Sequence, residues 1–101
     1  MKFELFMKGY WVCIYEKVND DEKLKEYAVK AMPALEKYSG KILARGGKSR
    51  TNEGIDSPRT VVIEFPNYEV AIKCYDSPEY QKAHAILNGI AIRHHQIVEG
   101  P

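Results

Sequence analysis

Features that mark specialised classes of protein are scarce in this 101-residue sequence. It has only two cysteines, Cys13 and Cys74, and neither lies in the paired Cys or Cys/His spacing that is typical of zinc sites. We therefore expect two free thiols and no metal site. No apolar run approaches the ~20 residues that span a bilayer, and the first residues lack a signal-peptide pattern. This predicts a cytoplasmic protein with no membrane partner.

An excess of one charge is also missing. The 15 Lys and Arg residues against 14 Asp and Glu residues leave a net charge of +1. A nucleic-acid-binding domain usually carries a clear positive excess, so we expect no nucleic-acid partner. What the sequence does have is 45% hydrophobic and 11% aromatic residues. That composition is typical of one globular domain, which we assign to residues 1–101 with residues 1–6 as a peripheral extension.

Apolar spacing predicts the secondary structure. Residues 10–15 are a continuous apolar run, and the strand expected at 59–65 contains the apolar run 61–63, which indicates strands buried on both faces. Leu24, Tyr27, Ala28, Ala31, Leu35 and Tyr38 recur at helical spacing on one face of a helix that ends near Gly40. Pro33 is expected to kink or break that helix. The other expected elements are a strand at 42–45 that continues in a more polar form to 53, helices at 67–75 and 77–88, and a short strand at 96–98. The expected N-caps are one residue of Asn19-Asp20-Asp21, then Asn67 and Ser77.

The order strand, helix, strand, strand, helix, strand is that of the ferredoxin-like split βαβ fold. It predicts an α+β protein with a four-stranded antiparallel sheet and helices on one face. The second face of such a sheet usually meets water, yet the first and third strands are apolar on both faces. No segment remains to cover the second face, so a second copy of the chain is the simplest cover. We therefore predict a homodimer.

Five short motifs occur in an order and at a spacing that resemble one protein family. They are Met7-Lys8-Gly9-Tyr10-Trp11, Ala44-Arg45-Gly46-Gly47, Val62-Ile63-Glu64-Phe65-Pro66, Tyr75-Asp76-Ser77-Pro78-Glu79-Tyr80-Gln81 and Val98-Glu99-Gly100. Through them residues 7–100 resemble the family called domain of unknown function 1330. The resemblance implies a dimeric α/β barrel, the fold also used by cofactor-free quinol-type monooxygenases, muconolactone isomerases and haem-dependent chlorite dismutases. It implies no established activity. Family members often carry a basic residue where this chain has Ile86-Leu87, so no role is carried over for that group.

Histidines are the first candidates for chemistry. His84 lies on the apolar face of the third predicted helix, where an imidazole can act as a general base or pack as a core or interface residue. His94 and His95 point to opposite faces if they lie in a strand, so at most one of them can join His84. Gly47-Lys48-Ser49 resembles the end of a P-loop, but Ile42 stands where its first glycine is required. We expect no cofactor.

A second candidate is the pair of Glu64 and Arg45. Glu64 lies in an apolar strand, where an unpaired carboxylate is costly, and Arg45 lies in the neighbouring strand of the expected hairpin. One interpretation is a structural ion pair. The other places Arg45, Glu64, Tyr80 and Trp11 around a ligand cleft between sheet and helices, with Glu64 or His84 as the catalytic base.

These observations leave three functions open. The first is a small cytoplasmic homodimer of uncharacterised activity with a small-ligand pocket between sheet and helices. The second is a cofactor-free monooxygenase or isomerase acting on a small aromatic molecule or lactone, with His84 or Glu64 as base and Arg45 stabilising the developing anion. The third is a non-enzymatic binding or stress-related module.

Overall fold

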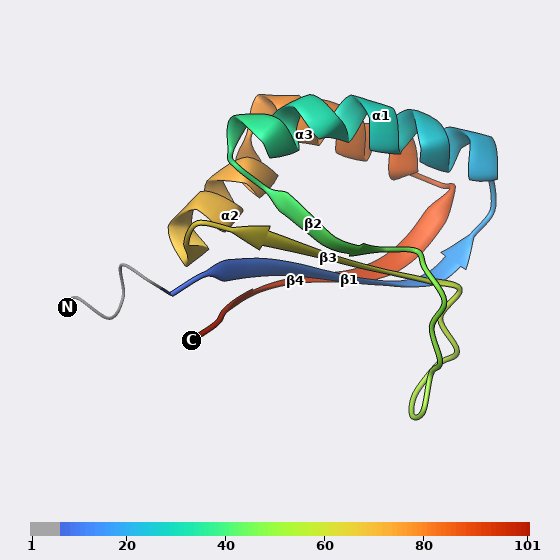
Figure 1. Ribbon diagram of the computed structural model, residues 1–101. Coiled ribbons are helices and arrows are strands. Elements are labelled where there is room, and N and C mark those ends of the chain that lie inside the picture. Colours follow the sequence, from blue (N-terminus) through green and yellow to red (C-terminus); the bar gives the residue numbers. More distant parts are fainter. Residues whose placement is uncertain (1–6) are drawn as a thin grey trace.

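The four strands of the computed structural model form one antiparallel sheet, and the helices lie together on one of its faces (Figure 1). The structure describes residues 7–101. The elements are β1 (Gly9–Val18), α1 (Asp21–Lys37), β2 (Lys41–Arg45), β3 (Arg59–Phe65), α2 (Tyr68–Asp76), α3 (Pro78–His84), the 3-10 turn η2 (Ala85–Leu87) and β4 (Ala91–Glu99). The predicted α+β class and the predicted order of elements are confirmed. The predicted peripheral extension at residues 1–6 lies outside the described residues.

The sheet order is β2-β3-β1-β4, which places the first and last strands side by side. In this register Trp11 of β1 lies opposite Ile63 of β3 and Ile97 of β4. Tyr15 lies opposite Arg59 on one side and Arg93 on the other. Because side chains two residues apart share a face, these pairs set which groups meet beneath the helices.

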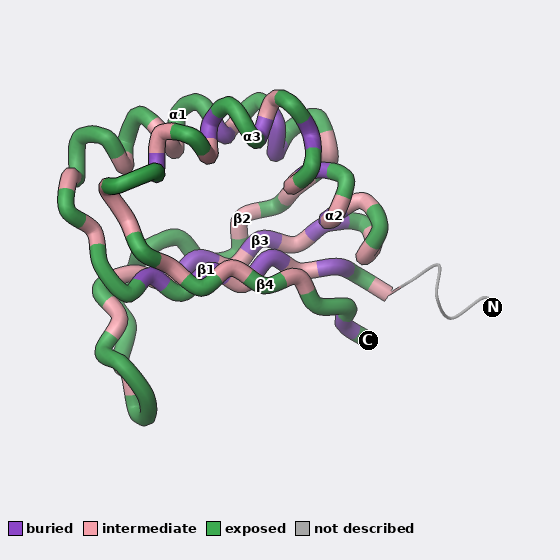
Figure 2. Tube along the Cα trace, turned by 180° about the vertical axis from the view of Figure 1, so that it is seen from behind, coloured by how far each residue is buried: buried purple, intermediate pink, exposed green. Residues whose placement is uncertain are grey.

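The core fills the space between the helices and the inner face of the sheet (Figure 2). Trp11 and Tyr15 of β1 are each 1% exposed, and Phe65 of β3 is equally buried. The indole N–H of Trp11 donates to the Ala71 carbonyl of α2 at 2.9 Å, which satisfies its one polar atom. The caps of α2 and α3 are the predicted Asn67 and Ser77, and Asp20 is the residue of the predicted segment 19–21 that caps α1; each accepts a backbone N–H group of its helix's first turn.

Two predicted boundaries are wrong, and of the kink or break expected at Pro33 the break is absent. The first helix is not broken at Pro33, because Pro33 is exposed and lies one turn after Val29, whose freed carbonyl water can reach. The polar continuation of β2 is absent, since residues 46–58 form an irregular loop that extends beyond the sheet, away from the helices (Figure 1). The last strand begins at Ala91 rather than residue 96, and its mixed polar sequence had concealed it.

The outer face of the sheet, opposite the helices, is only partly covered by the chain itself. Its side chains include Ile14, 42% exposed, and Val98, 45% exposed. The prediction that β1 and β3 are buried on both faces is therefore not met within the single chain. Within residues 7–101 there is also no helix of the length and apolarity needed to cross a membrane.

Candidate functional site

Three tyrosine hydroxyls surround one arginine beneath the helices. Arg93 of β4 donates from Nη2 to the Tyr80 hydroxyl at 2.6 Å, and from Nη1 to the hydroxyls of Tyr15 at 3.3 Å and Tyr27 at 3.4 Å. The Tyr27 and Tyr80 hydroxyls lie 2.8 Å apart in a further hydrogen bond. The guanidinium carbon also lies 5.5 Å from the Tyr15 ring centre and 5.4 Å from that of Tyr27. Arg93 is thus held by phenols from β1, α1 and α3.

This cluster borders a small cavity between α1 and the sheet. The cavity has a volume of about 40 Å³. Its floor is made of buried side chains of the inner sheet face, and its partly exposed rim comes from α1 and β2. The lining residues are Trp11, Cys13, Tyr15, Tyr27, Ala28, Ala31, Met32, Leu35, Ile42, Arg45, Arg59, Val61, Ile63 and Arg93. The walls are therefore mainly apolar, with cations at a few points.

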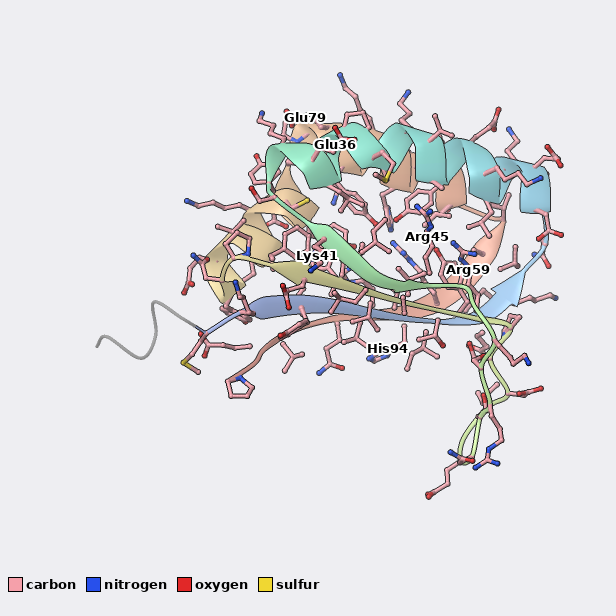
Figure 3. All side chains as sticks on the ribbon, viewed as in Figure 1. Glu36, Lys41, Arg45, Arg59, Glu79 and His94 are labelled. Atoms are coloured by element: carbon pink, nitrogen blue, oxygen red, sulfur yellow. The ribbon has the colours of Figure 1, made fainter. Side chains whose placement is uncertain are left out.

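Arg45 and Arg59 are the other two cations of the cavity. Both lie in the space between α1 and the sheet (Figure 3). The Arg59 guanidinium carbon lies 5.8 Å from the Tyr15 ring centre, on the side opposite Arg93, and its buried Nε has no hydrogen-bond partner within residues 7–101. Gly46 has a φ of 64°, and a side chain there would collide with the Arg59 guanidinium. The glycine of the Ala44-Arg45-Gly46-Gly47 motif thus leaves room for this cation.

Charge in the site is uncompensated. Among the side chains of residues 7–101 that line the cavity, none is a carboxylate. Burial raises the pKa of the Tyr27 and Tyr80 phenols, so both keep their protons at neutral pH. Burial lowers the pKa of Arg93, but the neighbouring oxygens of Tyr27, Tyr80 and Tyr15 raise it by more, so Arg93 remains a cation. Burial also raises the pKa of the Cys13 thiol to about 11, which keeps it from acting as a nucleophile.

Two histidines lie next to this cluster and pack against Tyr75. The ring centres of Tyr75 and His95 are 4.8 Å apart, and those of Tyr75 and His84 are 6.0 Å apart. Burial and the Arg93 charge lower the pKa of both imidazoles, that of His95 to about 4. Both are therefore neutral at physiological pH. His84 and Arg93 also line a second, open hollow where η2 leads into β4.

The predicted pair of Glu64 and Arg45 is not formed, since the two residues lie on opposite faces of the sheet. Arg45 pairs in register with Val61 and lines the cavity, whereas Glu64 lies on the outer face opposite Lys41. Glu64 instead accepts a hydrogen bond from the Tyr10 hydroxyl at 3.3 Å. The prediction failed because a strand that is apolar on both sides gives no alternation from which to assign a face.

The other predicted site residues lie on the inner side. Trp11 lines the cavity, and Tyr80 lies behind its wall, joined to it through Arg93 and Tyr27. His95 faces inward with His84, whereas His94 lies on the outer face (Figure 3), so only one of the adjacent histidines joins His84 as predicted. Within residues 7–101 no group of three or more His, Cys, Asp or Glu side chains is placed to hold a metal ion.

Sequence reasoning missed Arg93, Tyr15 and Tyr27 as site residues. The signal for Arg93 was present, because Arg93, His95 and Ile97 alternate at the two-residue period of a strand face. The strand predicted at 96–98 leaves Arg93 outside it, so this alternation is not recognised. Tyr27 was assigned to the apolar face of its helix without a polar partner, since that partner comes from the far end of the chain.

Comparisons with known proteins support the fold. Residues 8–101 match the model of a family described as domain of unknown function (DUF1330). No curated protein matches the chain.

Solved structures resemble this one at low sequence identity. A protein of unknown function from Rhodopseudomonas palustris has a TM-score of 0.75 at 13% identity, over 95% of this chain and 83% of that one. A variant of SnoaB, a cofactor-independent oxygenase from Streptomyces nogalater, has 0.62 at 11%, over 90% of each chain. An ethyl tert-butyl ether d (ethd) family protein from Bacillus halodurans has 0.59 at 15%, over 93% and 99%. At these identities the likeness shows a shared fold.

Proposed function

The chain belongs to the DUF1330 family, and from that membership and the site's geometry we propose that it is a homodimer that binds a small organic molecule in the cavity between α1 and the sheet. The observation that carries the binding proposal is the lining of this cavity. It combines a deeply buried tryptophan and tyrosine with three arginines and no carboxylate among the described residues. A mainly apolar hollow with a few convergent polar groups is typical of small-molecule sites. Arg59 and Arg93 are partly removed from water, and no carboxylate of residues 7–101 lines the cavity to offset their charge, which is costly to a fold that does not use it.

The homodimer is supported by the outer face of the sheet. Ile14, Val98 and Ile92 leave about half of their side chains exposed there, at 42%, 45% and 55%. A second copy that packs the same face against this one removes that apolar surface from water. Light scattering in dilute buffer tests this part, with an expected mass of twice the 11.6 kDa of the chain. A monodisperse monomer at micromolar concentration would show it to be wrong.

Binding is tested through Trp11, the single tryptophan of the chain, which lines the cavity. We expect its fluorescence to change saturably when the purified protein is titrated with benzoate or with its neutral isostere benzamide. Ala28→Leu should weaken this response by filling the rim of the cavity, whereas Lys30→Leu adds the same side chain to the exposed side of α1 and should leave it unchanged. Absence of a saturable response to both compounds would refute the proposal.

A second candidate, a cofactor-free isomerase or monooxygenase, is favoured by the shared hollow of His84 and Arg93. A neutral imidazole can remove a proton from a carbon beside a carbonyl group, and the guanidinium can stabilise the resulting enolate. In an isomerase the same proton returns to another atom of the substrate, so no co-reactant is consumed. In a monooxygenase the enolate carbon adds molecular oxygen to give a hydroperoxide, which loses water to leave a new carbonyl group; one oxygen atom stays in the product, the other leaves as water, and the substrate itself is the reductant.

Phenylpyruvate tests this candidate, because it has an enolisable C–H bond and a carboxylate. We expect the protein to accelerate its keto–enol interconversion, measured by ultraviolet absorbance, and His84→Gln to remove that acceleration while leaving benzoate binding intact. Saturable binding without acceleration would favour a binding module instead.

A further inference from the structure

The phenol–arginine cluster holds more hydrogen-bond donors than the protein gives it acceptors. A guanidinium carries five N–H groups, and the contacts of Arg93 occupy three of them with the oxygens of Tyr15, Tyr27 and Tyr80. One N–H of Nη2 and the Nε–H remain. The phenols bring three further O–H protons, and only one of these lies in the bond between Tyr27 and Tyr80. Within residues 7–101 no acceptor is recorded for the other two.

Ionisation of the phenols does not supply the missing acceptors or neutralise Arg93. A tyrosinate would neutralise Arg93 and accept its N–H groups, but burial raises the pKa of Tyr27 and Tyr80 well above neutral. Ion pairs within residues 7–101 join lysines to glutamates at the surface, and none of them includes Arg93. Tyr15 and Tyr80 are at most 1% exposed, so bulk water does not fully solvate the cluster. It is a fixed group of donors around a positive charge.

We propose that this cluster is a carboxylate receptor, in which Arg93 and the hydroxyls of Tyr15 and Tyr27 anchor the carboxylate of a small organic acid. The inference rests on the proposed function and names the ligand class of the same cavity. A carboxylate has two oxygens with about four lone-pair sites, and it takes paired N–H groups from a guanidinium. It therefore supplies both the missing charge and the missing acceptors. Arg59, whose Nε has no partner, adds a second cation on the other side of Tyr15.

The size of the cavity limits how the acid lies in it. A cavity that holds benzene has about 150 Å³, whereas this one has about 40 Å³. The enclosed part therefore accommodates the carboxylate and few further atoms. The apolar remainder of the acid then lies at the rim, where Met32 of α1 and Ile42 of β2 are partly exposed and Arg45 is exposed. This geometry favours a monocarboxylate with a narrow apolar body over an acid with several charged groups.

The experiment compares benzoate with benzamide, which has nearly the same shape and no charge. Trp11 fluorescence gives the affinity of each compound for the wild-type protein, and acetate tests the carboxylate alone. We expect benzoate to bind at least about tenfold more tightly than benzamide, because hydrogen bonds to charged groups carry most of the difference. Equal affinities would refute the carboxylate receptor and leave the proposed function standing. Failure of both compounds to bind would refute both proposals.

Variants locate the receptor. Arg93→Met should remove the preference for benzoate while benzamide still binds, and Arg50→Gln, which alters an exposed arginine of the 46–58 loop, should leave it intact. If Arg93→Met does not fold, Tyr15→Phe decides the matter, because it removes one O–H and keeps the ring. We expect about a fivefold loss of benzoate affinity in Tyr15→Phe and no change for benzamide. A preference for benzoate that persists in Arg93→Met, or one that is undiminished in Tyr15→Phe where that variant is the one that folds, would refute this site.

Discussion

The two faces of the sheet differ although the same strands build them. On the inner face Trp11 and Tyr15 are 1% exposed and lie under the helices, whereas on the outer face Ile14, between Cys13 and Tyr15 in sequence, is 42% exposed. Both faces are rich in apolar side chains, but only the inner one carries the phenol–arginine cluster. Apolar content therefore indicates that a face is to be covered, while interior polar groups mark a face as a candidate ligand site.

The largest difference between the two faces is expected in the free energy of unfolding that a truncated apolar side chain costs. Phe65 is 1% exposed, and its ring centre lies 5.0 Å from that of Trp11. We expect Phe65→Ala to lower the free energy of unfolding by about 3–5 kcal/mol, measured by urea denaturation. Val62→Ala, on the outer face of the same strand, should cost less than about 1.5 kcal/mol at low protein concentration. Similar losses in both variants would contradict the difference between the faces.

A charge on the outer face should separate the two copies of the proposed homodimer. Val12 lies between Trp11 and Cys13 on that face. We expect Val12→Asp to shift the protein from dimer to monomer, because a charge removed from water without a partner costs several kcal/mol. The control is Val29→Asp, the same substitution at a 74% exposed position of α1, which should remain dimeric by light scattering. Dissociation of both variants would point to general destabilisation rather than to this face.

The inner face should also make stability depend on pH. Burial lowers the pKa of His95 from 6.5 to about 4, so between these values the unfolded chain binds a proton that the folded chain does not. The contribution of His95 is therefore complete above pH 6.5 and is lost as the pH falls to about 4, by up to about 3 kcal/mol. Denaturation at a series of pH values should show a shallower loss for His95→Phe than for the wild type. Identical slopes would mean that His95 titrates normally.

The smallest effect on stability is expected for Arg45 and Glu64, the two residues that the sequence predicts to pair. Arg45 and Glu64 lie on opposite faces, so Arg45→Gln and Glu64→Gln should each change the free energy of unfolding by less than about 1 kcal/mol. A double-mutant cycle should give a coupling energy below about 0.5 kcal/mol. A larger coupling would restore the ion pair that the register excludes.

The sequence carried most of the fold and only part of the site, for physical reasons. Local patterns determine helices, caps and strands, and such patterns correctly predict the caps Asn67 and Ser77 and place the first cap within residues 19–21. The site depends on which face each strand residue takes, and that requires the register of β2 on β3 and of β4 on β1. The apolar neighbours of Glu64 contain no such information. The mixed polar and apolar composition of residues 91–95 likewise conceals the strand that assigns Arg93 to a face.

The pairing of β1 with both β3 and β4 affects the order in which the protein folds during its synthesis on the ribosome. Tyr15 and Arg93 lie 78 residues apart in the chain, yet they meet through the pairing of its first and last strands. Contacts of such long sequence separation form late, since the loop that they close must first lose its entropy. Synthesis proceeds from the N-terminus, so β1 and α1 emerge well before β4 can join them. The guanidinium therefore enters the interior in one of the last steps of folding, and a chain that stops before β4 has the phenols but not the cation.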